Sequence, residues 1–168
     1  MYHIKTQNKQ TKITNKLFLS NWGGSKDKKQ LEENNIKLII CINEEFEKSS
    51  FDKKMYEEMK IQHEYFTAAD HRTSILDLDK LVKLIRTGMK QGGVLVHCTM
   101  GMSRSATAVM AFLLYKMYNA PECPLDKQKK LLPKIMQFVQ KRRPVDPNIG
   151  FLKQLRDYEN KLKSSSSN

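Results

Sequence analysis

The chain has 168 residues, of which 39% are hydrophobic, so it is long enough for one folded domain with a single core and too short for two. Its 30 Lys and Arg residues against 18 Asp and Glu residues give a net charge of +12, which favours anionic partners such as phosphorylated proteins, nucleic acid or acidic lipid headgroups. Three cysteines are too few for a disulfide framework, and no spacing typical of a zinc site occurs, so we expect reduced thiols and no metal.

The ends of the chain and its apolar runs indicate where the protein resides. The stretch 1–12 is polar and the tail 164–168 is Ser-rich, so we expect flexible ends around a domain that spans residues 13–163. The longest apolar run, at 108–115, is far shorter than the roughly 20 residues needed to cross a bilayer. Without a recognisable secretion or lipidation signal, we expect a cytoplasmic location, with the nucleus as the alternative, and no membrane partner.

The first hundred residues alternate between strand-like and helix-like segments. Four short apolar runs predict strands, at 17–20, 36–42, 61–66 and 94–98. The longer stretches between them predict helices at 26–35, 51–60 and 77–90, and a turn at 21–24. This alternation predicts an α/β fold with a central, mostly parallel sheet flanked by helices.

The second half of the chain is mostly helical. Residues 103–118 predict an apolar helix, which the prolines of the segment 119–124 end. A further helix is predicted at 134–142, with Pro133 suited to its first turn. Asp146-Pro147 is typical of a cap followed by a first-turn proline, so a final helix is predicted from there to about Lys163.

The loop between the predicted strand 94–98 and helix 103–118 carries the chemistry. It consists of Cys98, Thr99, Met100, Gly101, Met102, Ser103 and Arg104. Such a loop can direct successive backbone N–H groups at one anion, and the helix dipole adds about half a positive charge there. Cys98 at its floor would be held as a thiolate nucleophile, and Arg104 would present a planar fork of donors to two phosphate oxygens. The residues Thr99 to Arg104 are therefore the predicted phosphate-binding residues.

The residues around this loop carry a resemblance to a known family. His97-Cys98-x₅-Arg104-Ser105, with Ser103 before the arginine, resembles the signature of the cysteine-dependent protein phosphatases, and its continuation is similar to the dual-specificity branch. Weaker similarities lie at 17–24, 36–45, 65–70 and 142–155, so the resemblance covers roughly residues 13–160. It implies a small phosphatase that consists of the catalytic domain only, with the protein-tyrosine-phosphatase-like fold.

The resemblance also implies roles for individual residues. Phosphotyrosine and phosphoserine/threonine of proteins would be hydrolysed through a cysteinyl-phosphate on Cys98, without a cofactor. Asp70 stands where the family has its general acid, and Ser105 resembles the hydroxyl that stabilises the leaving thiolate. His97 resembles the partner that supports the loop by hydrogen bonding. Phosphorylated proteins are thus the expected partners, and nothing in the sequence predicts an oligomeric state.

The general acid has competing candidates. Asp77 and Asp79 also precede Cys98, but they lie at the start of a predicted helix, where a carboxylate more often caps the helix or complements its dipole. We therefore favour Asp70. His71 either orients the acid loop or is an exposed bystander, and the second interpretation is favoured.

Three further features each allow two interpretations. Arg142 and Arg143 either bind substrate or hold the C-terminal segment, which is favoured. Cys41 is either a small buried residue, which is favoured, or the partner of Cys98 in a reversible disulfide. The stretch 119–133 is longer than the corresponding family connection and is either a surface loop or a partner-binding insertion. Met100 and Met102 make the rim of the loop more apolar than is usual in the family.

Two other functions compete with protein dephosphorylation. An RNA 5′-phosphatase on a similar fold agrees with the net charge of +12 and with Thr99, but that branch resembles His-Cys-Thr-His-Gly, whereas this loop has Met100. Nucleic acid is therefore a less favoured partner. A phosphate-binding scaffold without turnover is disfavoured because Cys98, Asp70 and Arg104 are all present.

Overall fold

The computed structural model describes residues 8–50, 52–121 and 130–165. Within these ranges five strands form one sheet in the order β1-β2-β5-β3-β4. They are β1 (Thr11–Thr14), β2 (Leu17–Ser20), β3 (Ile36–Asn43), β4 (Gln62–Thr67) and β5 (Gly93–His97). All neighbours run parallel except β1, which pairs antiparallel with β2. The predicted α/β fold with a mostly parallel sheet is confirmed, and β1 is an addition at its edge.

The sheet register places the carboxyl ends of the parallel strands side by side. His97 at the end of β5 pairs with Ser20 of β2 on one side and with Cys41 of β3 on the other. On β4, Thr67 pairs with Asn43 of β3. The segments that follow these four strands therefore meet at one edge of the sheet, where parallel α/β proteins bind ligands.

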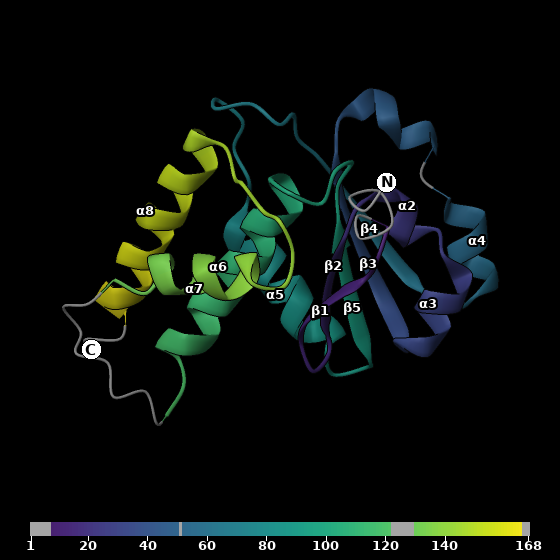
Figure 1. Cartoon of the computed structure of the whole chain (residues 1–168), viewed down its shortest axis with the longest axis horizontal. Helices are drawn as coiled ribbons and strands as arrows, with labels where there is room; N and C mark the ends of the chain where they lie inside the picture. Colours follow the sequence, from purple (N-terminus) through teal and green to yellow (C-terminus); the bar gives the residue numbers. More distant parts are fainter. Residues whose placement is uncertain (1–7, 51, 122–129, 166–168) are drawn as a thin grey trace.

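Helices cover both faces of the sheet, as Figure 1 shows. The helices on one face are α2 (Trp22–Ser25), α3 (Lys28–Glu33) and α4 (Lys53–Glu58), and those on the other are α5 (Leu78–Gly88), α6 (Arg104–Tyr118), α7 (Leu132–Gln140) and α8 (Ile149–Ser165). A 3₁₀ helix, η1 (Glu45–Ser50), follows β3. Helices were predicted at all of these places except α2 and η1.

Two local predictions are wrong, and asparagine side chains explain both. Residues 21–24 are not a turn, because the Asn21 side chain accepts a hydrogen bond from Gly24 N–H and so caps the short helix α2. The last helix begins at Ile149, after Asp146-Pro147, because Asn148 Oδ1 accepts the Phe151 N–H and provides the cap.

Part of each end that the sequence predicts to be flexible is ordered in the structure. Gln10 is buried and its side chain donates to the Gly24 carbonyl at 2.8 Å, while Thr11 opens β1. At the other end α8 continues through Ser165, so the tail predicted for 164–168 is helical over its first two residues. The remainder of both ends, 1–7 and 166–168, lies outside the described residues, as does most of the predicted 119–133 connection with Cys123.

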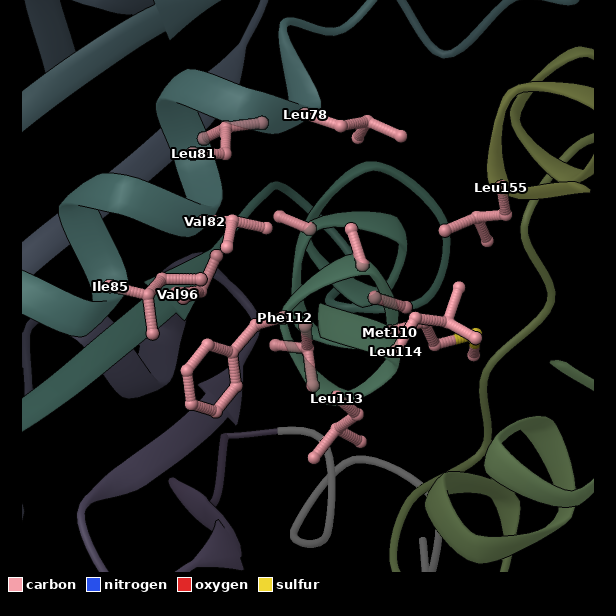
Figure 2. Packing of buried hydrophobic residues seen from close by; sticks show 14 of the residues in the cluster. Leu78, Leu81, Val82, Ile85, Val96, Met110, Phe112, Leu113, Leu114 and Leu155 are labelled. Carbon is pink, nitrogen blue, oxygen red and sulfur yellow. The ribbon is translucent and has the colours of Figure 1, made fainter. Parts of the chain in front are cut away.

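Helix α6 is the centre of the larger core and positions the loop in front of it. Its side chains are buried on nearly all sides, between α5, α7, α8 and the sheet. Figure 2 shows Phe112 of α6 on the side of Ile85 of α5 and Val96 of β5, and Met110 of α6 on the side of Leu155 of α8. Because the interior is close-packed, α6 cannot shift without disturbing this core, so its first residue, Arg104, is held firmly. Within the described residues, no helix has both the length and the hydrophobicity to span a membrane.

Candidate active site

The segment between β5 and α6 curls around the sulfur of Cys98. Cys98 is 2% exposed, and its Sγ accepts the backbone N–H of Gly101 at 3.2 Å and lies 3.1 Å from Ser105 Oγ. Gly101 has a φ of +67°, and a Cβ there would lie 2.5 Å from the carbonyl oxygen of Ser20. Only glycine fits both the left-handed backbone and this close approach. The sulfur thus lies at the floor of the loop, with hydrogen-bond donors available to a thiolate.

The guanidinium of Arg104 is buried and fixed at both of its terminal nitrogens. Nη1 donates to the carbonyl oxygen of Ala68 at 3.1 Å, and Nη2 donates to Thr99 Oγ1 at 3.2 Å. Arg104 is 6% exposed, and no group within the described residues accepts a hydrogen bond from its Nε. A buried donor without an acceptor is costly, so Nε is poised to bind an acceptor that enters the loop.

A carboxylate that the sequence analysis did not single out lies beside Arg104. Glu47 of η1 accepts from Thr99 Oγ1 at 2.8 Å through Oε1, and its Oε2 lies 3.8 Å from Arg104 Nη1. The backbone N–H of Glu44 donates to the same Oε2 at 3.0 Å, which holds the carboxylate in place. Three glutamates follow β3, and only the 3₁₀ geometry of η1 decides which one reaches the loop.

Asp70 lies at the opposite side of the loop, where the sequence analysis expected the general acid. Its Oδ1 accepts from Ser103 Oγ at 2.7 Å and from Asn148 Nδ2 at 2.8 Å. The Asn148 backbone N–H also donates to Ser103 Oγ at 3.1 Å, so the three residues form one network. Asn148 is a second residue that the sequence analysis missed, because only the fold brings the start of α8 to this loop.

The competing acids are engaged elsewhere. Asp77 caps α5 by accepting the Lys80 N–H at 3.0 Å, and Asp79 forms an exposed ion pair with Lys161 of α8. His71 is exposed and its Nδ1 pairs with Thr73 Oγ1 at 2.9 Å, so its hydrogen bonds within the described residues go to Thr73 and not to Asp70. The geometry thus favours Asp70 over both alternatives.

His97 supports the loop from within the core. Its ring is completely buried, and it hydrogen bonds to the backbone of Cys98. Burial lowers the pKa of His97 to about 4, so the imidazole is neutral at physiological pH. A neutral buried ring agrees with a supporting role.

Arg143 holds the loop from behind. It is 3% exposed, and its Nε donates to the carbonyl oxygen of Gly101 at 3.0 Å, while Nη2 donates to that of Met100 at 3.3 Å. Its Nη1 donates to the Lys9 carbonyl, and burial lowers the pKa of the guanidinium. Arg142, in contrast, is exposed and lies over the Phe138 ring. These contacts agree with a structural role for Arg143, which joins the C-terminal segment to the loop.

The sequence matches a family model described as the dual specificity phosphatase catalytic domain over residues 17–161. The chain belongs to this family. It is therefore a dual-specificity protein phosphatase, an enzyme that removes phosphate from phosphotyrosine and phosphoserine/threonine of proteins. The match covers most of the predicted domain 13–163, and the competing RNA 5′-phosphatase is not favoured.

Curated relatives of this phosphatase carry the same description. It is 34% identical to the human dual specificity protein phosphatase 13B, with 87% of this chain and 70% of the relative covered. It is 32% identical to the human dual specificity protein phosphatase 14, covering 92% and 71% of the two chains. It also matches the Arabidopsis thaliana dual specificity protein phosphatase 1 at 29% identity over 89% of this chain and 68% of the relative.

Solved structures share the fold of this phosphatase. The human tyrosine phosphatase-like serine/threonine/tyrosine-interacting protein superposes with a TM-score of 0.71 at 26% identity, covering 89% of this chain and 95% of the other. Human DUSP28 superposes with a TM-score of 0.70 at 22% identity over 91% and 94% of the chains. The second likeness, at its lower identity, supports the fold alone.

Cys41 is the remaining thiol near the site of this phosphatase. Its side chain is 1% exposed. In the sheet it pairs with His97, which is the residue before Cys98. Burial and the neighbouring Cys98 raise the pKa of the Cys41 thiol. Both cysteines are free, and Cys41 agrees with the favoured interpretation of a small buried residue.

Proposed function

We propose that Cys98, Arg104 and Asp70 carry out dephosphorylation of proteins through a cysteinyl-phosphate. The observation that supports this most is the position of the Cys98 sulfur, at the floor of a loop whose Gly101 N–H points to it. Arg104, at the start of α6, ends this loop, and Asp70, after β4, lies beside it. Nucleophile, phosphate ligand and acid thus meet at one place.

The first step transfers the phosphoryl group to the protein. The Cys98 thiolate attacks phosphorus in line, so that the S–P bond forms while the bond from phosphorus to the ester oxygen breaks. Backbone N–H groups of Thr99 to Ser103 and the Arg104 guanidinium bind the three other oxygens. Asp70 donates its proton to the departing oxygen, and an alcohol or phenol leaves.

The second step releases inorganic phosphate. Asp70, now a carboxylate, removes a proton from a water molecule that attacks phosphorus, and the S–P bond breaks. The departing sulfur regains its negative charge, which the Ser105 hydroxyl stabilises from 3.1 Å. In both steps every bond that forms is matched by one that breaks, and no step uses a metal ion. Within the described residues, no three His, Cys, Asp or Glu side chains form a group that could hold one.

Phosphorylated proteins are the substrates of this mechanism, and 5′-triphosphorylated RNA is the comparison substrate in its test. The decisive experiment exposes the enzyme to a ³²P-labelled phosphopeptide, stops the reaction with acid within milliseconds and locates the label. We expect label on the peptide that contains Cys98, and none on a Cys98→Ser variant. Label on another residue, or rapid turnover of 5′-triphosphorylated RNA without turnover of phosphopeptides, would contradict the proposal.

A further inference from the structure

Exposed hydrophobic side chains gather on the segments that build the catalytic site. Within the described residues the large exposed hydrophobic side chains are Trp22, Phe46, Ile75, Met100, Met117, Phe138 and Ile149. All of them except Met117 and Phe138 belong to segments that contact the catalytic loop. Exposed apolar groups that cluster around a pocket commonly mark a binding surface. We call Trp22, Phe46, Ile75, Met100 and Ile149 the apolar rim.

One part of the apolar rim lies on the Glu47 side of the loop. Met100 belongs to the loop itself and is 50% exposed. The backbone N–H of Trp22 donates to the Thr99 carbonyl at 3.2 Å, which sets Trp22 against the loop. Phe46, 75% exposed, precedes Glu47, the residue that contacts Thr99 and Arg104.

The other part lies on the Asp70 side. Ile75 is 83% exposed, and the two residues that flank it are both held by Gln154 of α8, which binds the Ser74 carbonyl and the Leu76 N–H. Ile149, 70% exposed, directly follows Asn148, the hydrogen-bond partner of Asp70. Figure 1 shows η1, the segment 68–77 and the start of α8 along one edge of the molecule.

Backbone contacts hold together the two segments that carry Ile75 and Ile149. A Cβ on Gly150 would lie 2.0 Å from the carbonyl oxygen of Arg72, so the start of α8 packs directly against the segment 68–77. Together with the two hydrogen bonds of Gln154, this contact fixes Ile75 and Ile149 relative to Asp70. The segments that carry apolar side chains on both sides of the catalytic loop are therefore held in place by backbone contacts.

We infer that the apolar rim binds bulky hydrophobic side chains next to the phosphorylated residue of the substrate. This inference rests on the proposed function, because it concerns the protein that delivers its phosphate to Cys98. An extended peptide advances about 3.3 Å per residue, so neighbours one or two positions from the phosphorylated residue reach the surfaces beside the loop. The preferred substrates are thus phosphoprotein segments with Leu, Ile, Met or Phe on both sides of the phosphorylated residue.

A peptide fits this surface better than a bilayer does. The segments of the apolar rim carry exposed carboxylates, Asp70 and Asp77, as well as exposed cations, Lys48 and Arg72, so this edge does not present the uniformly basic surface that anionic lipid headgroups attract. The apolar rim consists of single side chains from separate segments rather than one amphipathic helix. Such separate contacts suit individual side chains of a bound peptide.

The test compares two phosphotyrosyl peptides of equal length and charge. One has Leu at the two positions on each side of phosphotyrosine, and the other has Ser there. We expect kcat/KM to be about tenfold higher for the Leu peptide, because the rim loses water on binding it. The variants Phe46→Ser and Ile75→Ser/Ile149→Ser should each reduce this ratio severalfold, while hydrolysis of p-nitrophenyl phosphate stays unchanged.

Matched control variants are Met117→Ser and Phe138→Ser. These side chains are also exposed and apolar, but they lie on α6 and α7 beside a separate cavity of about 330 Å³. We expect both controls to keep the full preference for the Leu peptide. A preference lost equally in the rim and control variants would contradict a specific contact.

Other outcomes would overturn the inference in distinguishable ways. Equal kcat/KM for both peptides would overturn the apolar rim as a substrate contact and leave the proposed function intact. An enzyme that hydrolyses p-nitrophenyl phosphate but neither peptide would overturn the proposed function and, with it, the inference. Rim variants that lose only the hydrolysis of a phosphoinositide in phosphatidylcholine vesicles would assign the surface to a membrane instead.

Discussion

Asp70 and Asn148 are joined by a hydrogen bond of 2.8 Å, although 78 residues separate them in the chain. The bond connects the proposed acid to the start of α8, and Ser103 of the loop joins the same carboxylate oxygen. Because α8 packs on α6, the large core holds the acid and the loop in one frame. Catalysis by a positioned acid depends on such alignment.

Replacing Asn148 should therefore weaken acid catalysis without removing the acid. Asn148→Ser keeps an oxygen that can cap α8, but it lacks the amide that donates to Asp70. We expect kcat for a phosphoserine peptide to fall about tenfold, and kcat for p-nitrophenyl phosphate to fall less, because its phenolate leaves without a proton. Steady-state kinetics on both substrates check this, with the melting temperature as a control for folding. Equal losses on both substrates would point to general damage of the site.

Asp70 itself should show the same dependence on the leaving group more strongly. In Asp70→Asn we expect hydrolysis of a phosphoserine peptide to slow by about 10² to 10⁴, the usual contribution of a positioned acid. Hydrolysis of p-nitrophenyl phosphate should slow less, because its phenolate leaves without a proton. Asp77→Asn is the matched control, because its carboxylate caps α5. If Asp77→Asn lost the hydrolysis of the phosphoserine peptide and Asp70→Asn kept it, Asp70 would not be the acid.

Most of the fold could be predicted from the sequence, because the pattern of apolar residues within each segment indicates whether that segment is a strand or a helix. The continuous apolar run of β3 and the 3.6-residue repeat of α5 each reflect burial that neighbouring residues already encode. The strand β1 escaped prediction because the polar segment Thr11–Thr14 buries only alternate side chains and depends on pairing with β2.

The candidate site was predictable where its residues lie close together in the chain. Cys98 and Arg104 stand at the two ends of one loop, so their spacing indicated an anion site, and the resemblance to the phosphatase family added Ser105. Glu47 and Asn148 reach this loop only through the arrangement of η1 and α8, which no spacing in the sequence encodes. The same reasoning separates Arg143, which binds loop carbonyls, from its exposed neighbour Arg142.

The contact between Glu47 and Arg104 predicts that two substitutions affect the same step. Arg104→Lys keeps the charge but loses the planar fork, so we expect kcat to fall by about two powers of ten or more. Glu47→Gln keeps the size but removes the charge that lies 3.8 Å from Arg104 Nη1, and we expect a smaller loss of about five- to tenfold, also in kcat. The double variant should lose little more than Arg104→Lys alone, since both act on one group. A loss confined to KM would instead indicate that the pair only attracts substrate.

The buried imidazole of His97 predicts how stability depends on pH. Its pKa is about 4 in the folded protein and 6.5 in the reference state, so between these values the unfolded chain binds a proton that the folded chain excludes. The free energy of unfolding therefore rises as the pH increases from about 4 to 6.5 and keeps this contribution above 6.5. A difference of this size corresponds to a contribution on the order of 3 kcal/mol.

Urea denaturation at pH 5 and pH 7 measures this dependence, and His97→Asn isolates it. Asparagine can still hydrogen bond within the core but has no proton to gain, so we expect the variant to be less stable at pH 7 and to lose less stability on acidification than the unsubstituted protein. Carboxylates contribute to both proteins alike, so the difference between their slopes belongs to position 97. Parallel stability curves for the two proteins over this range would show that the His97 ring takes up its proton as readily when folded as when unfolded.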